Sequence, residues 1–230
     1  MLNERFVEGK MIITIDGPAA AGKGTLANVL AKTYHLVYFD TGMVYRAVGL
    51  DMYLHNEDPH DELKAAQYAG ALTFTHMHEL AKNPDFRSAI GGNYASIVSA
   101  HPKVRAALLK MQQDFSENPV FADGTPANGA IYDGRDTGTV VCPQADIKFF
   151  ITASTEVRAQ RRFKEFQAKG LDTDYETVLA DMKARDERDA TRATAPMKPA
   201  DDAIVFDTSA MSIEEVLAYA LKIIDERISA

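Results

Sequence analysis

The chain has 230 residues, 46% hydrophobic and 25% charged, which is the composition of a globular protein large enough to bury a sizeable core. Its 25 lysines and arginines stand against 33 aspartates and glutamates, and the net charge of −8 argues against a long nucleic acid or an anionic membrane as partner. The single cysteine, Cys142, excludes an intrachain disulfide, and segment 1–10 is charged and lacks the apolar core of a signal peptide. We therefore expect a cytoplasmic protein with a loose arm at 1–10.

Apolar runs and helical patterns alternate along the chain. We expect strands at 11–16, 36–39, 130–132, 147–151 and 203–206, and helices at 26–34, 43–54, 61–71 and 213–228. Ser212 and Glu215 have the spacing of a capping box at the start of the last helix. Because parallel strands need crossover helices, this alternation predicts an α/β fold, with a five-stranded parallel sheet and helices on both faces.

Two stretches interrupt the alternation and are expected to be inserts. Residues 60–120 contain the helical pattern at 61–71, then polar sequence with glycines, then a helix that begins near Pro102. Residues 154–192 form two helical segments around Gly170 and carry six of the chain's 12 arginines. The core is then expected to comprise 11–59, 121–153 and 193–230, with a turn-rich loop at 122–129.

A glycine-rich loop joins the first strand to the first helix. It reads Gly17-Pro18-Ala19-Ala20-Ala21-Gly22-Lys23-Gly24-Thr25. In this context the G-x-x-x-x-G-K pattern cradles phosphates with backbone N–H groups, while Lys23 reaches the β- and γ-phosphates of ATP and Thr25 offers a hydroxyl to Mg²⁺. The strict pattern places Ser or Thr directly after the lysine, where this chain has Gly24. The guanine-reading motif N-K-x-D is missing from the sequence, which disfavours a GTPase.

Charged residues at strand ends and in the second insert suit phosphate chemistry. Asp133 ends the third strand and is a candidate to hold Mg²⁺ through water. Arg46 would lie about one helical turn inside the helix that follows Asp40, and its guanidinium can fork onto a phosphate. The six arginines of the second insert are Arg158, Arg161, Arg162, Arg185, Arg188 and Arg192. Arginines in such number favour oxyanion recognition over an ordinary solvated face.

Three further segments carry a specific resemblance. They are DTGMVYR at 40–46, YDGRDTGT at 132–139 and RDERDATR at 185–192. Together with the phosphate loop they resemble the signatures of bacterial-type cytidylate kinase, in the same order and across most of 11–225. That family transfers the γ-phosphate of ATP to CMP or dCMP, on a P-loop kinase fold with a monophosphate-binding insert (here 60–120) and an arginine-rich lid (here 154–192).

The resemblance also implies which residues meet each substrate. On the CMP side it implies Thr41, Tyr45, Arg46, Ser96, Arg105, Arg135, Asp136, Arg185, Asp189 and Arg192. On the ATP side it implies the loop 17–25 with Arg158 and Arg162, and the implied catalytic set is Lys23, Arg135, Arg188 and Arg192. Asp136 would accept a hydrogen bond from the cytosine amino group, and Arg185 and Asp189 would hold the sugar.

Two alternatives stay open at this point. One is a kinase for another small acceptor, such as UMP, a different nucleotide or dephospho-coenzyme A. The other is an ATP-dependent switch that binds a protein partner through the arginine segment. For a kinase we expect Mg²⁺ with ATP as the only cofactor and a monomer as the working form. No general base is needed, because an acceptor phosphate is already an anion at neutral pH.

Overall fold

The computed structural model describes residues 10–121, 123–168 and 170–229. The strands are β1 (Met11–Asp16), β2 (Val37–Asp40), β3 (Gly129–Gly134), β4 (Ile147–Thr152) and β5 (Ile204–Asp207). The helices are α1 (Lys23–Tyr34), α2 (Gly42–Leu54), α3 (Glu62–Ala71), α4 (Phe74–Leu80), α5 (Ala89–Val98), α6 (Pro102–Glu117), α7 (Thr155–Ala168), α8 (Tyr175–Thr191) and α9 (Ile213–Ile228). A 3₁₀-helix, η1 (Pro84–Arg87), and a π-helix, η2 (Thr137–Val141), complete them.

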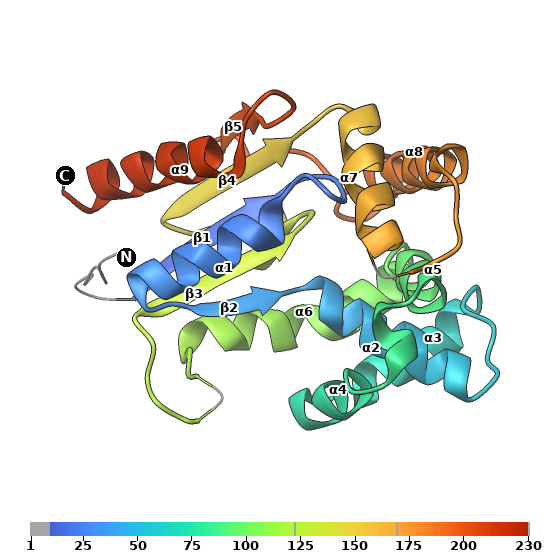
Figure 1. Cartoon of the computed structure of the whole chain (residues 1–230). Coiled ribbons are helices and arrows are strands. Elements are labelled where there is room, and N and C mark those ends of the chain that lie inside the picture. Colours follow the sequence, from blue (N-terminus) through green and yellow to red (C-terminus); the bar gives the residue numbers. More distant parts are fainter. Residues whose placement is uncertain (1–9, 122, 169, 230) are drawn as a thin grey trace. The chain divides into compact units, whose positions relative to one another are not determined.

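The strands form one sheet in the order β2-β3-β1-β4-β5 (Figure 1). Strand β1 is central and pairs in parallel with both of its neighbours, so that Ile13 lies opposite Ile131 of β3 and Ile147 of β4. Strand β5 continues the parallel arrangement beyond β4. The predicted five-stranded parallel α/β sheet is confirmed. Because β1 is central, the loop that leaves its carboxyl end emerges between the ends of β3 and β4, where ligands bind in open α/β sheets.

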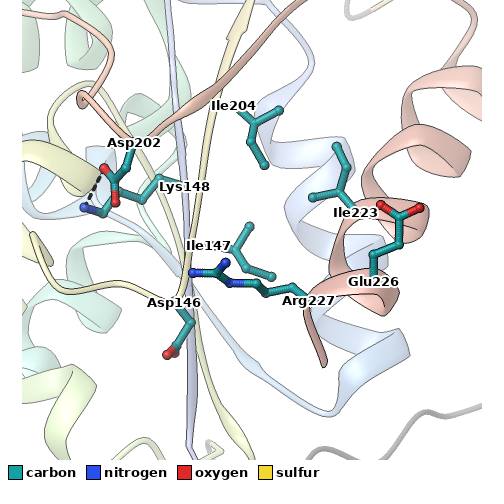
Figure 2. A pocket seen from close by; sticks show the side chains of 8 residues that line it. All are labelled: Asp146, Ile147, Lys148, Asp202, Ile204, Ile223, Glu226 and Arg227. Atoms are coloured by element: carbon teal, nitrogen blue, oxygen red, sulfur yellow. Dashed lines mark hydrogen bonds and ion pairs between the residues drawn. The ribbon is translucent and has the colours of Figure 1, made fainter. Parts of the chain in front are cut away.

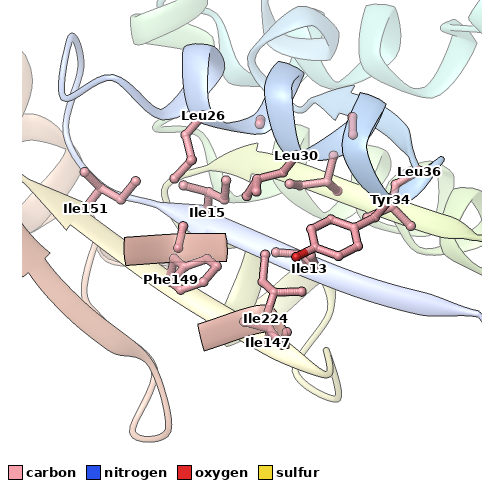
Figure 3. Packing of buried hydrophobic residues seen from close by; sticks show 14 of the residues in the cluster. Ile13, Ile15, Leu26, Leu30, Tyr34, Leu36, Ile147, Phe149, Ile151 and Ile224 are labelled. Atoms are coloured by element: carbon pink, nitrogen blue, oxygen red, sulfur yellow. The ribbon is translucent and has the colours of Figure 1, made fainter. Parts of the chain in front are cut away.

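The main core lies between the sheet and helices α1 and α9. Figure 3 shows Leu30 and Tyr34 of α1 directed at the strands, where they meet Ile13, and it places Ile224 of α9 in the same cluster. These side chains are all fully buried, which stabilises the fold by about 1.5–3 kcal/mol for each. On the other face of β1 the short helix η2 packs, and the sheet is therefore covered by helical structure on both sides.

Helices α7 and α8 lie side by side (Figure 1) and share a small apolar cluster. Ala159 of α7 and Val178 and Met182 of α8 are buried in it, and Ala19 and Ala20 of the glycine-rich loop pack against them. The two helical segments expected on either side of Gly170 are thus present. Their contact with the loop rests on apolar side chains that the arginine pattern did not reveal.

The chain folds as two compact units. The first comprises Met1–Phe39, Ser116–Thr191 and Ala195–Ala230, and the second comprises Asp40–Phe115 and Arg192–Thr194. Within the second unit, α2 packs closely on α5 at Gly49. A Cβ at Gly49 would lie 2.8 Å from the backbone nitrogen of Ala95, so only glycine permits this approach of the two helices.

Most expected elements are confirmed to within three residues at either end. The capping box of α9 is present, because the Ser212 hydroxyl accepts from the backbone of Glu215 and the Glu215 carboxylate accepts from that of Ser212. The stretch between 72 and 101, expected to be irregular, instead contains α4, η1 and α5. Its helices begin at side-chain caps, Thr73 for α4 and Ser88 for α5. Residues 1–9 of the expected arm and residue 122 of the turn-rich loop lie outside the described residues.

Candidate active site

The glycine-rich loop has the backbone that phosphate binding requires. Gly17 has φ +141°, and a Cβ there would lie 1.9 Å from the carbonyl oxygen of Ile151. Gly22, the residue before α1, is left-handed with φ +99°. Both conformations favour glycine, so the two glycines of the motif are needed for the loop to curl over the start of α1. Helix α1 adds the positive end of its dipole there.

Lys23 is buried at the start of α1, with 6% of its side chain exposed. Its Nζ donates to the carbonyl of Pro18 at 3.0 Å and lies 3.6 Å from the Asp133 carboxylate. Burial, reinforced by the positive charge of Arg135, lowers the pKa of Lys23 to about 8. The lysine and the aspartate proposed from separate motifs are thus neighbours in space. Thr25 is exposed on the first turn of α1.

Asp16 adjoins the phosphate loop, and no motif in the sequence indicated it. It ends β1 directly before Gly17, and only 4% of it is exposed. Its carboxylate accepts from the backbone and hydroxyl of Thr137 and from the backbone of Gly138, at 2.7–2.8 Å. Burial raises the pKa of Asp16 to about 6. The loop that carries Arg135 and Asp136 is therefore tied to the strand that enters the phosphate loop.

Arg135 is held before any ligand arrives. Its Nε donates to Asp189 of α8 at 2.9 Å, and its Nη1 donates to the carbonyl of Gly134. Arg185 lies 3.9 Å from the same Asp189 oxygen. Burial lowers the pKa of Arg135, but the carboxylates of Asp189 and Asp133 outweigh it and hold the pKa above its ordinary value. This cluster joins the end of β3 to α8.

Arg158 spans three elements of the first unit. Its guanidinium donates to Ala19 in the phosphate loop at 3.3 Å, to Ala153 at 2.8 Å and to Asp186 of α8 at 2.7 Å. Only 3% of Arg158 is exposed, so these internal partners occupy a buried arginine that the resemblance assigned to the ATP side. Arg162 is more exposed and lies over the ring of Phe166.

Two further residues fasten the phosphate loop from the carboxyl end of β5. The buried hydroxyl of Thr208 lies within hydrogen-bond distance of two carbonyls, that of Ala21 in the phosphate loop at 3.2 Å and that of Thr152 at 3.1 Å. Arg161 in turn donates to the Thr208 carbonyl at 2.8 Å. Arg161 belongs to the arginine-rich segment, but Thr208 stands in no motif and its partners are distant in sequence, so no sequence pattern indicated this contact.

The second unit holds most of the residues expected to bind CMP. Arg105 lies over the ring of Tyr45, with its guanidinium carbon 5.3 Å from the centroid, and donates to the carbonyl of Ser99. Arg46 donates to the carbonyl of Phe86 at 3.0 Å. The structure thus brings Tyr45 and Arg105 together, from helices α2 and α6. Thr41, Ser96 and Arg192 are also buried members of this unit.

The expected residues therefore divide between the two units. The first holds Gly17, Pro18, Ala19, Ala20, Ala21, Gly22, Lys23, Gly24, Thr25, Asp133, Arg135, Asp136, Arg158, Arg162, Arg185, Arg188 and Asp189. The second holds Thr41, Tyr45, Arg46, Ser96, Arg105 and Arg192. Asp136 is buried, and Arg188 is partly exposed on α8.

A pocket elsewhere in the first unit does not belong to this site. Figure 2 shows Ile147, Ile204 and Ile223 around it, with Arg227 near the end of α9. Ile147 and Ile204 begin their strands, whereas the phosphate loop follows the end of β1. In a parallel sheet the starts and the ends of the strands lie on opposite sides, so the pocket is remote from the phosphate loop.

The residues present fit a magnesium–nucleotide complex. The phosphate loop offers backbone N–H groups and a buried lysine, and an added Cβ at Gly22 would meet no atom within 4 Å, so there is open space above it. The Thr25 hydroxyl and the Asp133 carboxylate offer oxygen ligands, which suit a hard cation such as Mg²⁺.

No helix within the described ranges is both long enough and apolar enough to cross a membrane.

Comparison with known proteins shows the family of this chain. The chain matches the cytidylate kinase family model over residues 13–226. It is 50% identical over 214 residues to the cytidylate kinase of Rhodospirillum rubrum, covering 93% of this chain and 97% of that protein. It is 48% identical over 217 residues to the cytidylate kinase of Xanthobacter autotrophicus, covering 94% and 98%.

One solved structure shares the fold at low sequence identity. It is an uncharacterized protein from Eubacterium ventriosum, with a TM-score of 0.50 and 14% identity over 94% of this chain and 99% of that one. The family model and the relatives together span nearly the whole sequence, from β1 to α9. The resemblance read from the motifs is confirmed, and this chain belongs to the cytidylate kinase family.

Proposed function

We propose that this protein transfers the γ-phosphate of ATP to CMP or dCMP, giving CDP or dCDP and ADP. The observation that carries the proposal is the geometry around Lys23. A buried lysine at the start of α1 lies 3.6 Å from Asp133, in a loop with two glycines in conformations that favour glycine. Relatives named cytidylate kinase at 48–50% identity support cytidine monophosphate as the acceptor.

The site residues take their roles from the family pattern and from their chemistry. We assign the loop 17–25 to the phosphates of ATP. We assign Tyr45, Arg46, Arg105 and Arg192 to the acceptor side, with Thr41 and Ser96. In the first unit, Arg135 would meet the acceptor phosphate, Asp136 the cytosine amino group, and Arg185 and Asp189 the sugar. We assign Arg188 and Arg162 to the ATP side, with α7 and α8 as the lid.

Transfer then needs positioning and charge neutralisation more than covalent help. An oxygen of the CMP phosphate forms a bond to the γ-phosphorus, while the bond from that phosphorus to the β–γ bridging oxygen breaks and its electron pair leaves on ADP. Lys23 and Arg135 stabilise the oxygens of the moving group. Held by Thr25 and, through water, by Asp133, Mg²⁺ would neutralise charge on the β- and γ-phosphates.

A structural role fits Arg158 better than direct contact with ATP. Its buried guanidinium already joins Ala19, Ala153 and Asp186. We therefore propose that it fixes the phosphate loop to α7 and α8 and so orients the loop for the triphosphate.

We further propose that the protein is cytoplasmic, since the single, buried Cys142 suits a reducing compartment. We propose a monomer as its working form.

A panel of acceptors tests the function. ADP release is measured with ATP and CMP, dCMP, UMP, AMP, GMP or dephospho-coenzyme A as acceptor, at equal concentrations. We expect the highest kcat/KM with CMP or dCMP. Faster turnover with UMP, AMP or dephospho-coenzyme A would refute the cytidine assignment, and ATP hydrolysis that ignores every acceptor would favour a switch protein.

A further inference from the structure

Tyr38 contacts the phosphate site from the neighbouring strand. Its hydroxyl on β2 donates to Oδ2 of Asp133 on β3, at 3.2 Å. The other oxygen of Asp133 lies 3.6 Å from Nζ of Lys23. Strands β2 and β3 are adjacent in the sheet, so the contact joins two fixed elements. With 13% of its side chain exposed, Asp133 lies between a neutral hydroxyl and a buried cation.

The same pair of side chains lies against Gly24. A Cβ on Gly24 would lie 3.3 Å from the Tyr38 hydroxyl and 3.4 Å from Oδ2 of Asp133. A serine or threonine, as the strict phosphate-loop pattern has there, would need more room still. Gly24 therefore leaves space for the Tyr38–Asp133 hydrogen bond against the first turn of α1.

We propose that Tyr38 is a positioning residue, whose hydroxyl holds the Asp133 carboxylate over Gly24 and keeps it from turning both oxygens toward Lys23. A carboxylate without this donor would move toward the nearest cation, because an anion in a partly buried place gains most from the closest positive charge. Lys23 would then be engaged by Asp133 instead of by a triphosphate. This inference rests on the proposed function, since it concerns how the same site binds ATP.

The test removes one oxygen. Tyr38→Phe keeps the ring and deletes the hydroxyl. We expect the Kd for ATP, measured by calorimetry in EDTA without Mg²⁺, to rise about tenfold, as loss of a hydrogen bond to a charged group predicts. In turnover with Mg²⁺, the KM for ATP should rise by a similar factor, whereas the KM for CMP stays within twofold of the native value. A general distortion of the site would raise the KM values for both ATP and CMP.

Tyr34→Phe is the matched control. The Tyr34 hydroxyl also donates to a carboxylate, that of Asp225 at 2.9 Å, but at the other end of α1. This variant loses the same kind of bond, so its melting temperature should fall while its Kd for ATP is unchanged. If both variants weaken ATP binding equally, the effect is one of general stability and the proposal is overturned.

A second variant tests the explanation of Gly24. Gly24→Ala should weaken ATP binding about fivefold in the native background without lowering the melting temperature, because alanine is the better helix former. In the Tyr38→Phe background the added methyl has more room, and its further effect should be less than twofold. Independent, multiplying effects, or native-like ATP binding by Tyr38→Phe, would overturn the proposal.

The calorimetric measurement of ATP binding does not depend on the acceptor nucleotide. Should the native chain fail to phosphorylate CMP, the proposed function falls, while the EDTA binding data still decide the role of Tyr38. If CMP is phosphorylated and Tyr38→Phe binds ATP like the native chain, the function stands and the positioning role is refuted.

Discussion

The carboxylate of Asp16 accepts two hydrogen bonds from Thr137, one from its backbone N–H and one from its hydroxyl, both at 2.8 Å. The two residues are 121 positions apart in the sequence. Asp16 leads into the phosphate loop, and Thr137 follows Arg135 and Asp136. One buried side chain therefore connects the phosphate loop to the loop that carries Arg135 and Asp136.

The pKa of Asp16 predicts a pH-dependent stability. Burial raises this pKa from 3.8 to about 6, so the folded chain holds the proton more tightly than the unfolded chain does. The stability that the group contributes is complete below about pH 4 and is lost as the pH rises through 6. A shift of this size corresponds to about 3 kcal/mol.

Asp16→Asn removes that titration. Between pH 4 and pH 7, the free energy of unfolding of the native chain relative to the variant should fall by about 2.5 kcal/mol. Urea unfolding of both proteins at several pH values measures the difference. A difference that stays constant across this range would contradict a buried, titrating Asp16.

Replacing Arg158 by Lys should destabilise the protein. A lysine cannot reach Ala19, Ala153 and Asp186 together, so buried acceptors lose their donors, and we expect a loss of about 3 kcal/mol. Arg162→Lys is the control, because its pair with Glu165 is more exposed and should matter by less than about 1 kcal/mol. Denaturant midpoints of the two variants decide the matter, and equal midpoints would contradict the fastening role.

Replacing Arg135 by Met should impair both transfer and stability. We expect kcat to fall about 100-fold or more, because a cation facing the transferred group is lost. The free energy of unfolding should also fall by about 2–4 kcal/mol, since the buried carboxylate of Asp189 loses its partner at 2.9 Å. For Arg135→Lys, both kcat and the free energy of unfolding should lie between those of the native protein and of Arg135→Met. Steady-state kinetics beside urea unfolding checks this, and native turnover by Arg135→Met would remove the residue from the catalytic set.

Asp136→Ala should reduce the preference for cytidine. If the carboxylate accepts from the cytosine amino group, its loss should lower the ratio of kcat/KM for CMP to that for UMP by about tenfold or more. Asp123→Ala is the control, because Asp123 is exposed and its carboxylate accepts hydrogen bonds from the backbone and hydroxyl of the neighbouring Thr125. An unchanged CMP/UMP ratio in Asp136→Ala would exclude the base-reading role.

Local patterns in the sequence predicted what depends on near neighbours. The five strands follow from short apolar runs, and α9 from a capping box whose two residues stand three positions apart. Helix α4 was missed because it spans only seven residues, and α5 because it contains the adjacent glycines Gly91 and Gly92, which are poor helix formers. Their N-caps are the single residues Thr73 and Ser88, and a lone threonine or serine does not predict the start of a helix.

Contacts between distant residues could not be predicted in this way. Motif spacing led to Lys23 and Asp133 separately, but no pattern indicated that Tyr38, 95 residues before Asp133, would donate to it. The arginine-rich segment indicated phosphate binding for Arg158, but no pattern in it indicated that this arginine would be buried and would donate to Ala19 and Asp186. Which arginines face a ligand depends on the burial of each, and composition does not report that.

The fixing of Arg135 by Asp189 and Gly134 bears on the entropy of ligand binding. A free arginine on a surface samples many rotamers, and immobilising it opposes binding by about 2 kcal/mol. In this protein the Nε of Arg135 donates to Asp189 and its Nη1 to the carbonyl of Gly134. That ordering is completed when the chain folds, so an arriving phosphate meets a fork that has little conformational freedom left to lose.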